Sequence, residues 1–306
     1  MKILLLGKNG QVGWELQRAL GVLGEVVALD FDSCGPLKAD FSDPESLAAT
    51  VRAVAPQIIV NAAAHTAVDK AESEPDFARA LNATSPAVLA REAASLGAWL
   101  MHYSTDYVFD GSGSTPWQED SPTGPLSVYG ATKLEGEEAI RASGCQHLIF
   151  RTSWVYAARG GNFAKTMLKL AKERDKLTVI DDQIGSPTGA DLLADLTAHA
   201  LRAAMARRGL AGTYHAVAGG ETSWHGYARH VIEFARAAGQ PIKVAPENIV
   251  AVPTSAFPTP AKRPGNSRMN TEKLRSSFGL VLPGWQAGVE RMLTEVSNGT
   301  EPKAPS

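Results

Sequence analysis

The feature that most constrains this chain is a glycine-rich turn near its beginning. Gly7, Gly10 and Gly13 follow a short apolar run at 2–6 and open an amphipathic segment. Glycines permit a tight turn from a strand into a helix, and the unpaired N–H groups at the start of a helix attract a diphosphate. The spacing is one residue longer than in the dinucleotide-binding pattern G-x-G-x-x-G. The turn predicts a parallel α/β fold that binds a dinucleotide, the alternative being a strand-to-helix turn that binds nothing.

Short apolar runs alternate with longer helical patterns through the first two thirds of the chain. This order is typical of parallel βαβ units. The expected strands are Lys2–Leu6, Glu25–Leu29, Gln57–Asn61, Ala98–Ser104, His147–Thr152 and Leu177–Ile180. The expected helices lie near Gln11–Leu20, Pro44–Val54, Pro75–Leu96, Ser127–Ser143 and Asn162–Arg174. Six strands with crossover helices predict a Rossmann-type doubly wound parallel sheet.

The regular pattern fades beyond Thr213, where prolines crowd the segment from Pro241 to Pro264 and prevent long helices. We expect a smaller, loop-rich substrate-binding domain, formed by about 153–176 and 211–306. The dinucleotide-binding domain then comprises 1–152 and about 177–210. The tail from Asn298 to Ser306 is predicted to be frayed.

Charge and cysteine content narrow the function. The chain has 30 Lys+Arg against 32 Asp+Glu, which excludes a dominant basic surface for nucleic acid. The apolar run near the N-terminus is too short for a membrane span or a signal peptide. Cys34 and Cys145 form no disulfide framework, and the seven histidines lack the spacing of a zinc site. We therefore expect a cytoplasmic protein with neither nucleic acid nor membrane as a partner.

An acidic residue at the end of the second expected strand suggests a contact with the cofactor's adenosine ribose. Asp30 lies 17 residues beyond Gly13, where a carboxylate can bond both ribose hydroxyls and repel a 2′-phosphate. Asp30 by itself favours NADH over NADPH. Lys8 in the glycine-rich turn can offset the repulsion, so use of both cofactors stays open, and the alternative for Asp30 is a solvated carboxylate.

A phenol and an ammonium group lie four residues apart in the expected helix 127–143. Tyr129 and Lys133 therefore share one helix face, and a nearby cation favours the phenolate form of tyrosine by lowering its pKa. Thr105 follows an expected strand at the sheet edge where such folds bind ligands, and its hydroxyl can bond a carbonyl oxygen. The three residues predict proton transfer to a carbonyl, the alternative being two surface residues of a helix.

These residues, in this order, together with Asn82 and Asn61-Ala62-Ala63-Ala64, resemble the extended type of the short-chain dehydrogenase/reductase superfamily. Further segments resemble the dTDP-4-dehydrorhamnose reductase family, and the similarity runs from Met1 to about Leu293. These segments are 7–16, 65–69, 103–111, 150–156 and 262–267.

The resemblance implies reduction of a 4-keto group on a dTDP-linked deoxysugar by hydride from NADPH or NADH. Tyr129 would donate the proton, Lys133 would hold the nicotinamide ribose, and Thr105 would bind the substrate oxygen. The implied cofactor-binding residues are Gly7, Asn9, Gly10, Gln11, Val12, Gly13, Asp30, Asp40, Phe41, Ala63, Ala64, His65, Thr66, Asn82, Tyr103, Tyr129 and Lys133.

Substrate contacts are implied for Thr105, Asp106, Trp154, Arg263 and Asn266. The indole of Trp154 can stack on a sugar ring, the alternative being core packing. The guanidinium of Arg263 suits a diphosphate, the alternative being a solvated surface arginine.

The resemblance also implies a homodimer bridged by Mg²⁺. Glu15, Asp191 and Glu290 are the expected carboxylate ligands, since Mg²⁺ prefers oxygen ligands. Asp191 is shorter than the glutamate expected there. The alternative is three unrelated surface carboxylates.

Two other functions remain open. An extended-type epimerase or dehydratase acting on a nucleotide sugar would use the same tyrosine and lysine, although Thr105-Asp106-Tyr107 lacks the Asp-Glu pair expected of a dehydratase. A non-catalytic regulatory subunit of the same fold would need none of these groups, so the intact Thr105, Tyr129 and Lys133 argue against it.

Overall fold

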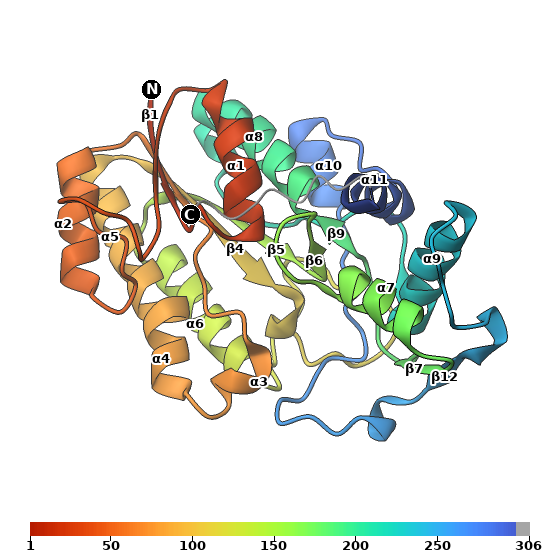
Figure 1. The fold of residues 1–306 in the computed structure, drawn as a ribbon. Helices are drawn as coiled ribbons and strands as arrows, with labels where there is room; N and C mark the ends of the chain where they lie inside the picture. Colours follow the sequence, from red (N-terminus) through yellow and green to blue (C-terminus); the bar gives the residue numbers. More distant parts are fainter. Residues whose placement is uncertain (298–306) are drawn as a thin grey trace.

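The computed structural model describes residues 1–297 and contains a six-stranded parallel sheet at its centre (Figure 1). The strands lie in the order β10-β5-β4-β3-β1-β2, and every neighbouring pair in this sheet is parallel. Their bounds are β1 Lys2–Leu6, β2 Glu25–Leu29, β3 Ile58–Asn61, β4 Trp99–Thr105, β5 Gln146–Thr152 and β10 Gly212–His215. The predicted doubly wound sheet is confirmed.

The alternation of side chains along β1 explains why both faces of the sheet are covered. Ile3 and Leu5 join one buried cluster with helices α1 and α8, whereas Leu4 and Leu6 join a second cluster with α2, α5 and α6. Figure 1 shows these two helical layers on either side of the sheet. Burial on both faces is what an uninterrupted apolar strand requires. The helices are α1 Gln11–Gly21, α2 Pro44–Val54, α5 Ser85–Leu96, α6 Val128–Ala142 and α8 Ala190–Ala206.

The expected sixth strand forms, but its predicted place in the central sheet was wrong. Leu177–Ile180 does form a strand, β7, but β7 pairs with β12 (Ile249–Val252) outside the central sheet. The edge position beside β5 belongs to β10, whose Tyr214 and His215 are buried. Short apolar runs do not reveal their partner, and only the long-range pairing separates the two candidates. The division into two domains stays a prediction. β10 lies in the central sheet although its residues were assigned to the substrate-binding domain, whereas β7 lies outside that sheet although its residues were assigned to the dinucleotide-binding domain.

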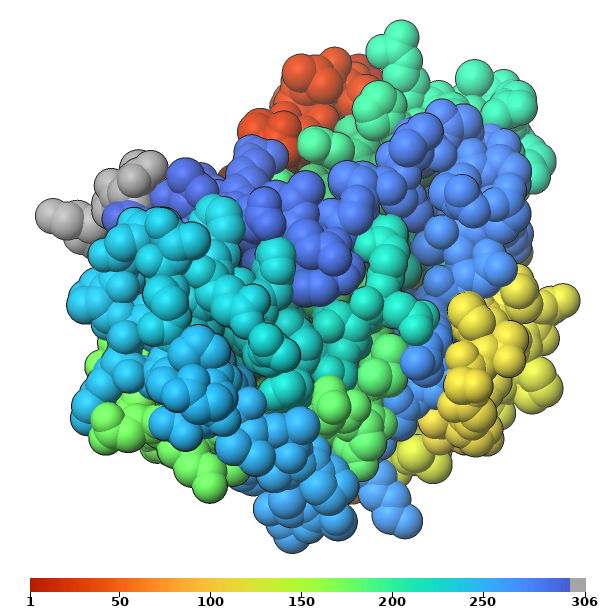
Figure 2. All heavy atoms as spheres, turned by 90° about the vertical axis from the view of Figure 1, so that its right-hand side faces the viewer, coloured from red at the N-terminus to blue at the C-terminus, as the bar shows by residue number. Residues whose placement is uncertain are grey.

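The remaining elements form a second lobe beside the carboxyl ends of the sheet strands, at the right of Figure 1. Helices α7 (Phe163–Glu173), α9 (Trp224–Ala237) and α11 (Trp285–Ser297) share one buried cluster there, and α7 and α9 share a second one with β7 and β12. Figure 2 views this lobe and shows that residues beyond about 210 cover most of that face.

Short elements complete the chain, and the tail from Asn298 to Ser306, predicted to be frayed, lies outside the described residues. A π-helical turn, Ala80–Thr84, joins α4 to α5 within the predicted helix 75–96. No helix among residues 1–297 is long and apolar enough to cross a membrane. The short elements are α3 Val68–Ala71, α4 Pro75–Arg79, β6 Val155–Tyr156, β8 Ile184–Gly185, β9 Thr188–Gly189, β11 Thr222–Ser223, α10 Glu272–Phe278, and the 3₁₀ turns Asp106–Val108, Arg208–Leu210, Pro246–Asn248 and Thr254–Ala256.

Candidate active site

The glycine-rich turn connects β1 to α1 as its sequence predicts. Gly7 has a φ of +85°, and a Cβ atom there would lie 2.7 Å from the backbone nitrogen of Ala63. A Cβ atom on Gly13 would lie 1.9 Å from the carbonyl oxygen of Gly7. Gly10 precedes α1 without a side-chain cap, so the first N–H groups of this helix remain available to an anion.

We expect Gly13→Ala to disrupt this turn. The added methyl group collides with backbone, so α1 or the turn must shift, at a cost of about 1–3 kcal/mol in the free energy of unfolding. Dinucleotide binding should weaken at least tenfold in a fluorescence titration. Gly21→Ala, at the other end of α1, is the control because a Cβ atom there meets nothing within 4 Å. Equal binding by both variants would contradict this role of Gly13.

Asp30 lies just beyond β2 and holds the glycine-rich turn. Its carboxylate accepts hydrogen bonds from the backbone N–H groups of Asn9 at 2.9 Å and Phe31 at 2.8 Å. Asp30 also lines the cavity described below. The carboxylate therefore faces the space expected to hold the adenosine ribose.

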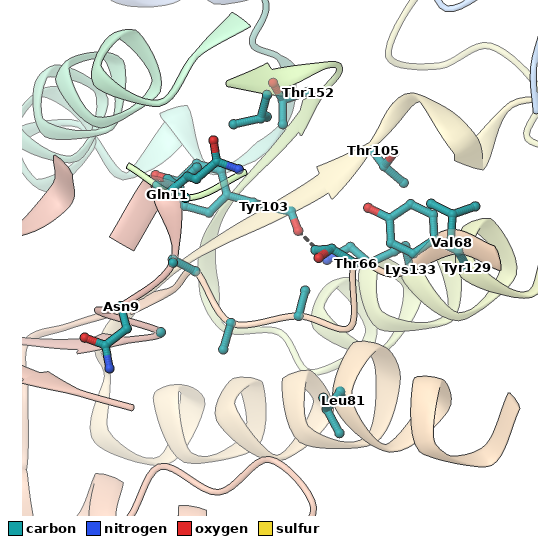
Figure 3. A pocket seen from close by; sticks show the side chains of 18 of the residues that line it. Asn9, Gln11, Thr66, Val68, Leu81, Tyr103, Thr105, Tyr129, Lys133 and Thr152 are labelled. Atoms are coloured by element: carbon teal, nitrogen blue, oxygen red, sulfur yellow. Dashed lines mark hydrogen bonds between the residues drawn. The ribbon is translucent and has the colours of Figure 1, made fainter. Parts of the chain in front are cut away.

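Thr105, Tyr129 and Lys133 lie together at the carboxyl end of β4 (Figure 3). Thr105 is the last residue of β4, and Tyr129 and Lys133 occupy successive turns of α6. Ser127 caps this helix by accepting the N–H of Gly130 at 3.2 Å. The cap fixes the start of α6 and so the height of Tyr129 above the sheet.

The pKa of Tyr129 shifts opposite to the expectation. Burial raises it to about 12, a hydrogen bond with Thr105 lowers it, and the charge of Asp106 raises it. The phenol therefore keeps its proton at neutral pH. Lys133 does not act on it here because Nζ turns away toward the sheet and donates to the carbonyl oxygen of Tyr103 at 2.5 Å.

Two further ionisable groups of the site are shifted by burial. Burial lowers the pKa of Lys133 to about 8, partly offset by the charge of Glu137. Burial raises the pKa of Asp106 to about 6, although hydrogen bonds from Ser267 and Thr105 oppose the change. Shifts of this kind in a cavity are typical of sites of proton transfer.

One cavity of about 1530 Å³ joins the glycine-rich turn to these three residues. Figure 3 shows Asn9 and Gln11 toward one end and Thr105 and Tyr129 toward the other. The predicted residues that line the cavity are Gly7, Asn9, Gly10, Gln11, Val12, Asp30, Asp40, Phe41, Ala63, Ala64, Thr66, Tyr103, Thr105, Asp106, Tyr129, Lys133 and Trp154.

Other predicted residues lie behind the wall of this cavity and support it. Asn82 is fully buried, accepts the N–H of His65 at 2.9 Å and donates to the carbonyl oxygen of His65 at 3.1 Å. The buried Asn266 amide donates to the carbonyl oxygens of Ser112 and Thr115. Asn82, His65, Gly13, Arg263 and Asn266 are absent from the described cavity lining.

Trp154 and Arg263 each have a protein partner at the places implied for substrate contacts. The Trp154 ring stacks on Trp224 with a centroid distance of 3.7 Å, and both line the cavity. Arg263 forms a bidentate ion pair with Asp69, with Nη1 3.1 Å from Oδ1 and Nη2 2.7 Å from Oδ2. This ion pair lowers the pKa of the Asp69 carboxyl. One indole face and part of the guanidinium are therefore already occupied.

The predicted set of magnesium ligands is not brought together. Glu290 lies 3.3 Å from His230, and Asp191 pairs with Arg291 at 3.1 Å. Burial is the largest cause of the raised pKa of Glu15, and the negative charges of Asp191 and Glu295 raise it further. Within residues 1–297 no group of three or more His, Cys, Asp or Glu side chains fits a metal ion. A Mg²⁺ site that gathers Glu15, Asp191 and Glu290 from two subunits stays a prediction.

Several cavity residues were missed by the sequence reasoning. Arg159, between β6 and α7, donates to the carbonyl oxygen of Asn9 at 3.3 Å and lies 4.2 Å from the Trp14 ring centroid. Trp224 comes from α9, far along the chain. The Arg-Gly-Gly run at 159–161 was a detectable loop signal, whereas nothing near Trp224 indicated a ligand. The other missed lining residues are Phe31, Ala39, Ser42, Ala62, Val68, Phe77, Leu81, Ser104, Tyr107, Thr152, Ser153, Val155, Ala158, Gly160, Gly161 and Lys165.

Known proteins resemble the chain over nearly its whole length. The family model described as "RmlD substrate binding domain" matches residues 1–298. The chain is 61% identical to a dTDP-4-dehydrorhamnose reductase of Shigella flexneri, with 98% of this chain and 99% of that protein covered. A reductase of that name from Escherichia coli K12 is 60% identical over the same shares.

Solved structures agree with these relatives. A dTDP-4-dehydrorhamnose reductase of Clostridium acetobutylicum has a TM-score of 0.86 and 36% identity, covering 97% of this chain and 100% of that one. The Bacillus anthracis reductase, in complex with NADP, has a TM-score of 0.84 and 33% identity, covering 96% and 99%. The UDP-glucose 4-epimerase of Thermus thermophilus, at 20% identity and a TM-score of 0.78, shares the fold.

Proposed function

The chain belongs to the dTDP-4-dehydrorhamnose reductase family, and from this premise we propose that it reduces the 4-keto group of dTDP-4-dehydro-L-rhamnose to give dTDP-L-rhamnose. The observation that carries the proposal is the position of Thr105, Tyr129 and Lys133 in one wall of the cavity that begins at the glycine-rich turn. A hydride donor bound along this cavity would bring its reactive end to the phenol.

The residues present fit a nicotinamide dinucleotide. The free N–H groups of α1 suit the diphosphate, and Gly7 and Gly10 leave room for it. When bound, NADPH or NADH supplies the hydride. Asp30 would bond the adenosine ribose, and Lys133 would bond the nicotinamide ribose. Arg159, from the second lobe, would cover the glycine-rich turn through its hydrogen bond to Asn9.

The proton reaches the substrate from Tyr129. Its raised pKa, about 12, keeps the phenol protonated until negative charge develops on the carbonyl oxygen. Thr105, whose hydroxyl donates to Asp106 in the free protein, would turn this hydrogen to the carbonyl oxygen of the substrate and so fix its position. Because Thr105 is buried and Tyr129 is half-buried in the cavity wall, the developing charge meets oriented dipoles in place of much of the mobile water.

The substrate is proposed to lie between the two lobes. Asp106 and Trp154 line the cavity and would contact the sugar, whereas Arg263 would turn one side of its guanidinium to the diphosphate. Asn266 would act indirectly, by holding the loop at 112–115.

A turnover assay tests the function. Purified protein mixed with dTDP-4-dehydro-L-rhamnose should oxidise one NADPH for each sugar reduced, and dTDP-glucose, which has no keto group, is the control. Tightly bound NAD that is regenerated without net consumption would indicate an epimerase or dehydratase. Absence of turnover with any keto-sugar nucleotide, together with tight binding of another protein, would favour a regulatory subunit.

Cofactor preference rests on Asp30. Asp30→Ala removes a carboxylate that bonds a 2′-OH and repels a 2′-phosphate, so the ratio of kcat/KM for NADPH to that for NADH should rise, by about tenfold. The variant also loses the hydrogen bonds to Asn9 and Phe31. This loss affects the kcat/KM values for both cofactors, so it does not change their ratio. Asp76→Ala, at an exposed position on α4, is the control. An unchanged ratio would remove Asp30 from the ribose site.

A homodimer in the cytoplasm completes the proposal. Sedimentation of the purified protein gives the oligomeric mass, and a monomer over the whole concentration range would refute this part.

A further inference from the structure

Three buried side chains form a row beneath the proposed site. Asn61 ends β3, His102 lies opposite it on β4, and the two are direct partners in the strand register. The Asn61 amide nitrogen is 3.0 Å from His102 Nδ1, and His102 Nε2 is 3.4 Å from Lys133 Nζ. All three residues are at most 2% exposed. Each hydrogen on these atoms must therefore find its acceptor within the protein.

The backbone decides which way the Asn61 amide points. Its oxygen accepts the N–H of Ala63 at 3.1 Å. Rotating the amide by 180° would place NH₂ against this backbone N–H, so the NH₂ group must face His102. Nδ1 of His102 then accepts this hydrogen bond and carries no proton.

The tautomer of His102 follows. A neutral imidazole without a proton on Nδ1 carries it on Nε2, the atom that faces Lys133. A doubly protonated His102 would oppose the Asn61 NH₂ group and would also be a buried cation beside a lysine. Burial and the charge of Lys133 both lower the pKa of His102.

The N–H of Nε2 affects the two forms of Lys133 differently. The uncharged amine can accept this hydrogen while donating to the carbonyl oxygen of Tyr103. The ammonium has only donors, so it faces the N–H without gaining a hydrogen bond. We propose that His102, held as its Nε2–H tautomer by Asn61, is a positioning residue that favours the uncharged form of Lys133 and orients its amine.

Of the other groups near Lys133, Glu137 favours its charged form, and Tyr129 carries no charge. Glu137, one turn further along α6, favours the ammonium, but its own charge is shared with Arg151 and Arg141. Tyr129, one turn earlier, stays protonated. Burial and the proposed effect of His102 therefore oppose Glu137 in setting the charge of Lys133.

The tautomer can be read directly by ¹⁵N NMR of histidine nitrogens in the free protein. We expect His102 to show a protonated Nε2 and no titration between pH 5 and 9. His215 is an internal control, because it is also buried but its Nδ1 faces the carbonyl oxygen of Asn270 at 3.1 Å and must carry the proton. A protonated Nδ1 on His102 would overturn the proposal.

Asn61→Asp reverses the expected tautomer with little change in shape. A carboxylate accepts from Nδ1–H, which leaves Nε2 as an acceptor for the Lys133 ammonium. The acid dissociation constant of Lys133 should fall by about tenfold or more in ¹³Cε NMR, with the signal assigned by its loss in Lys133→Met.

The new carboxylate also acts directly through its charge, and His102→Phe separates the two effects. In the His102→Phe background, Asn61→Asp should change the Lys133 titration clearly less than in the wild-type background. Equal changes in both backgrounds would refute the role of His102. The inference concerns the role of Lys133 in the proposed site, but these spectra need no substrate, so a failure of the reductase proposal would appear separately, in the turnover assay.

Discussion

Tyr129→Phe is expected to lower turnover by ~10²–10⁴-fold while leaving the fold and cofactor affinity nearly unchanged. The substitution removes only the phenolic oxygen, which is the proposed source of the proton, and keeps the ring that packs edge to face on Tyr107. The loss should appear in kcat and in kcat/KM alike, because the proton is needed in the transition state more than in substrate binding. Steady-state kinetics and a cofactor titration measure the two quantities.

Tyr227→Phe is the matched control. Its hydroxyl is buried in the second lobe without a hydrogen-bond partner, so its removal should change neither turnover nor cofactor affinity. Turnover of Tyr129→Phe near the wild-type value would exclude Tyr129 as the proton donor. Loss of turnover in both variants would point to a general effect of removing buried hydroxyl groups.

Arg151→Met should cause the largest loss of stability, about 3–5 kcal/mol in the free energy of unfolding. Arg151 and Glu137 are both buried and joined by hydrogen bonds of 2.9 and 2.7 Å. Without Arg151, the ion pair that remains to the Glu137 carboxylate among the described residues is with Arg141, which is partly exposed. Breaking one half of a buried pair costs more than replacing both halves, since it leaves a charge without compensation.

The pH dependence of this loss has a definite sign. Burial raises the pKa of Glu137, but Arg151 outweighs this effect and lowers it overall. The wild-type pair thus stabilises the fold above the unfolded-state pKa of glutamate and loses this contribution as the pH falls. In Arg151→Met the glutamate pKa should rise, so the deficit in stability should shrink toward acid pH.

Urea denaturation of three variants checks this account. Arg141→Met should cost at most about 1 kcal/mol because Arg141 is partly exposed. Adding Glu137→Met to Arg151→Met should restore much of the loss. If the single and double replacements were equally unstable, packing around Arg151 and not its charge would be the cause.

The parts of the site that the sequence predicted are those built by local patterns. The turn at Gly7–Gly13 needs only a strand, glycines and a helix in succession. Tyr129 and Lys133 need only helical spacing, and Thr105 only a strand end. All of these residues except Lys8 and Gly13 line the cavity, and Gly13 acts by letting α1 approach the backbone of Gly7.

The parts that the sequence could not predict depend on contacts between distant segments. The pKa of Tyr129 was expected to fall because Lys133 is near in sequence, but burial dominates and the carbonyl oxygen of Tyr103 draws Nζ away. Asn266 was expected in the site, yet its amide is used by a loop about 150 residues earlier. Side-chain direction and burial decide such roles, and a pattern of residue types specifies neither.

The contact between Ser267 and Asp106 has a consequence for how the protein becomes active as it is made. Ser267 donates to Asp106, which also accepts a hydrogen bond from Thr105 at 3.1 Å. The ribosome completes the glycine-rich turn, α6 and all six central strands before it adds Ser267. A nascent chain can therefore have a complete central sheet while its proposed proton-transfer residues still lack their last support. The order of synthesis separates formation of the dinucleotide cradle from formation of a finished reaction site.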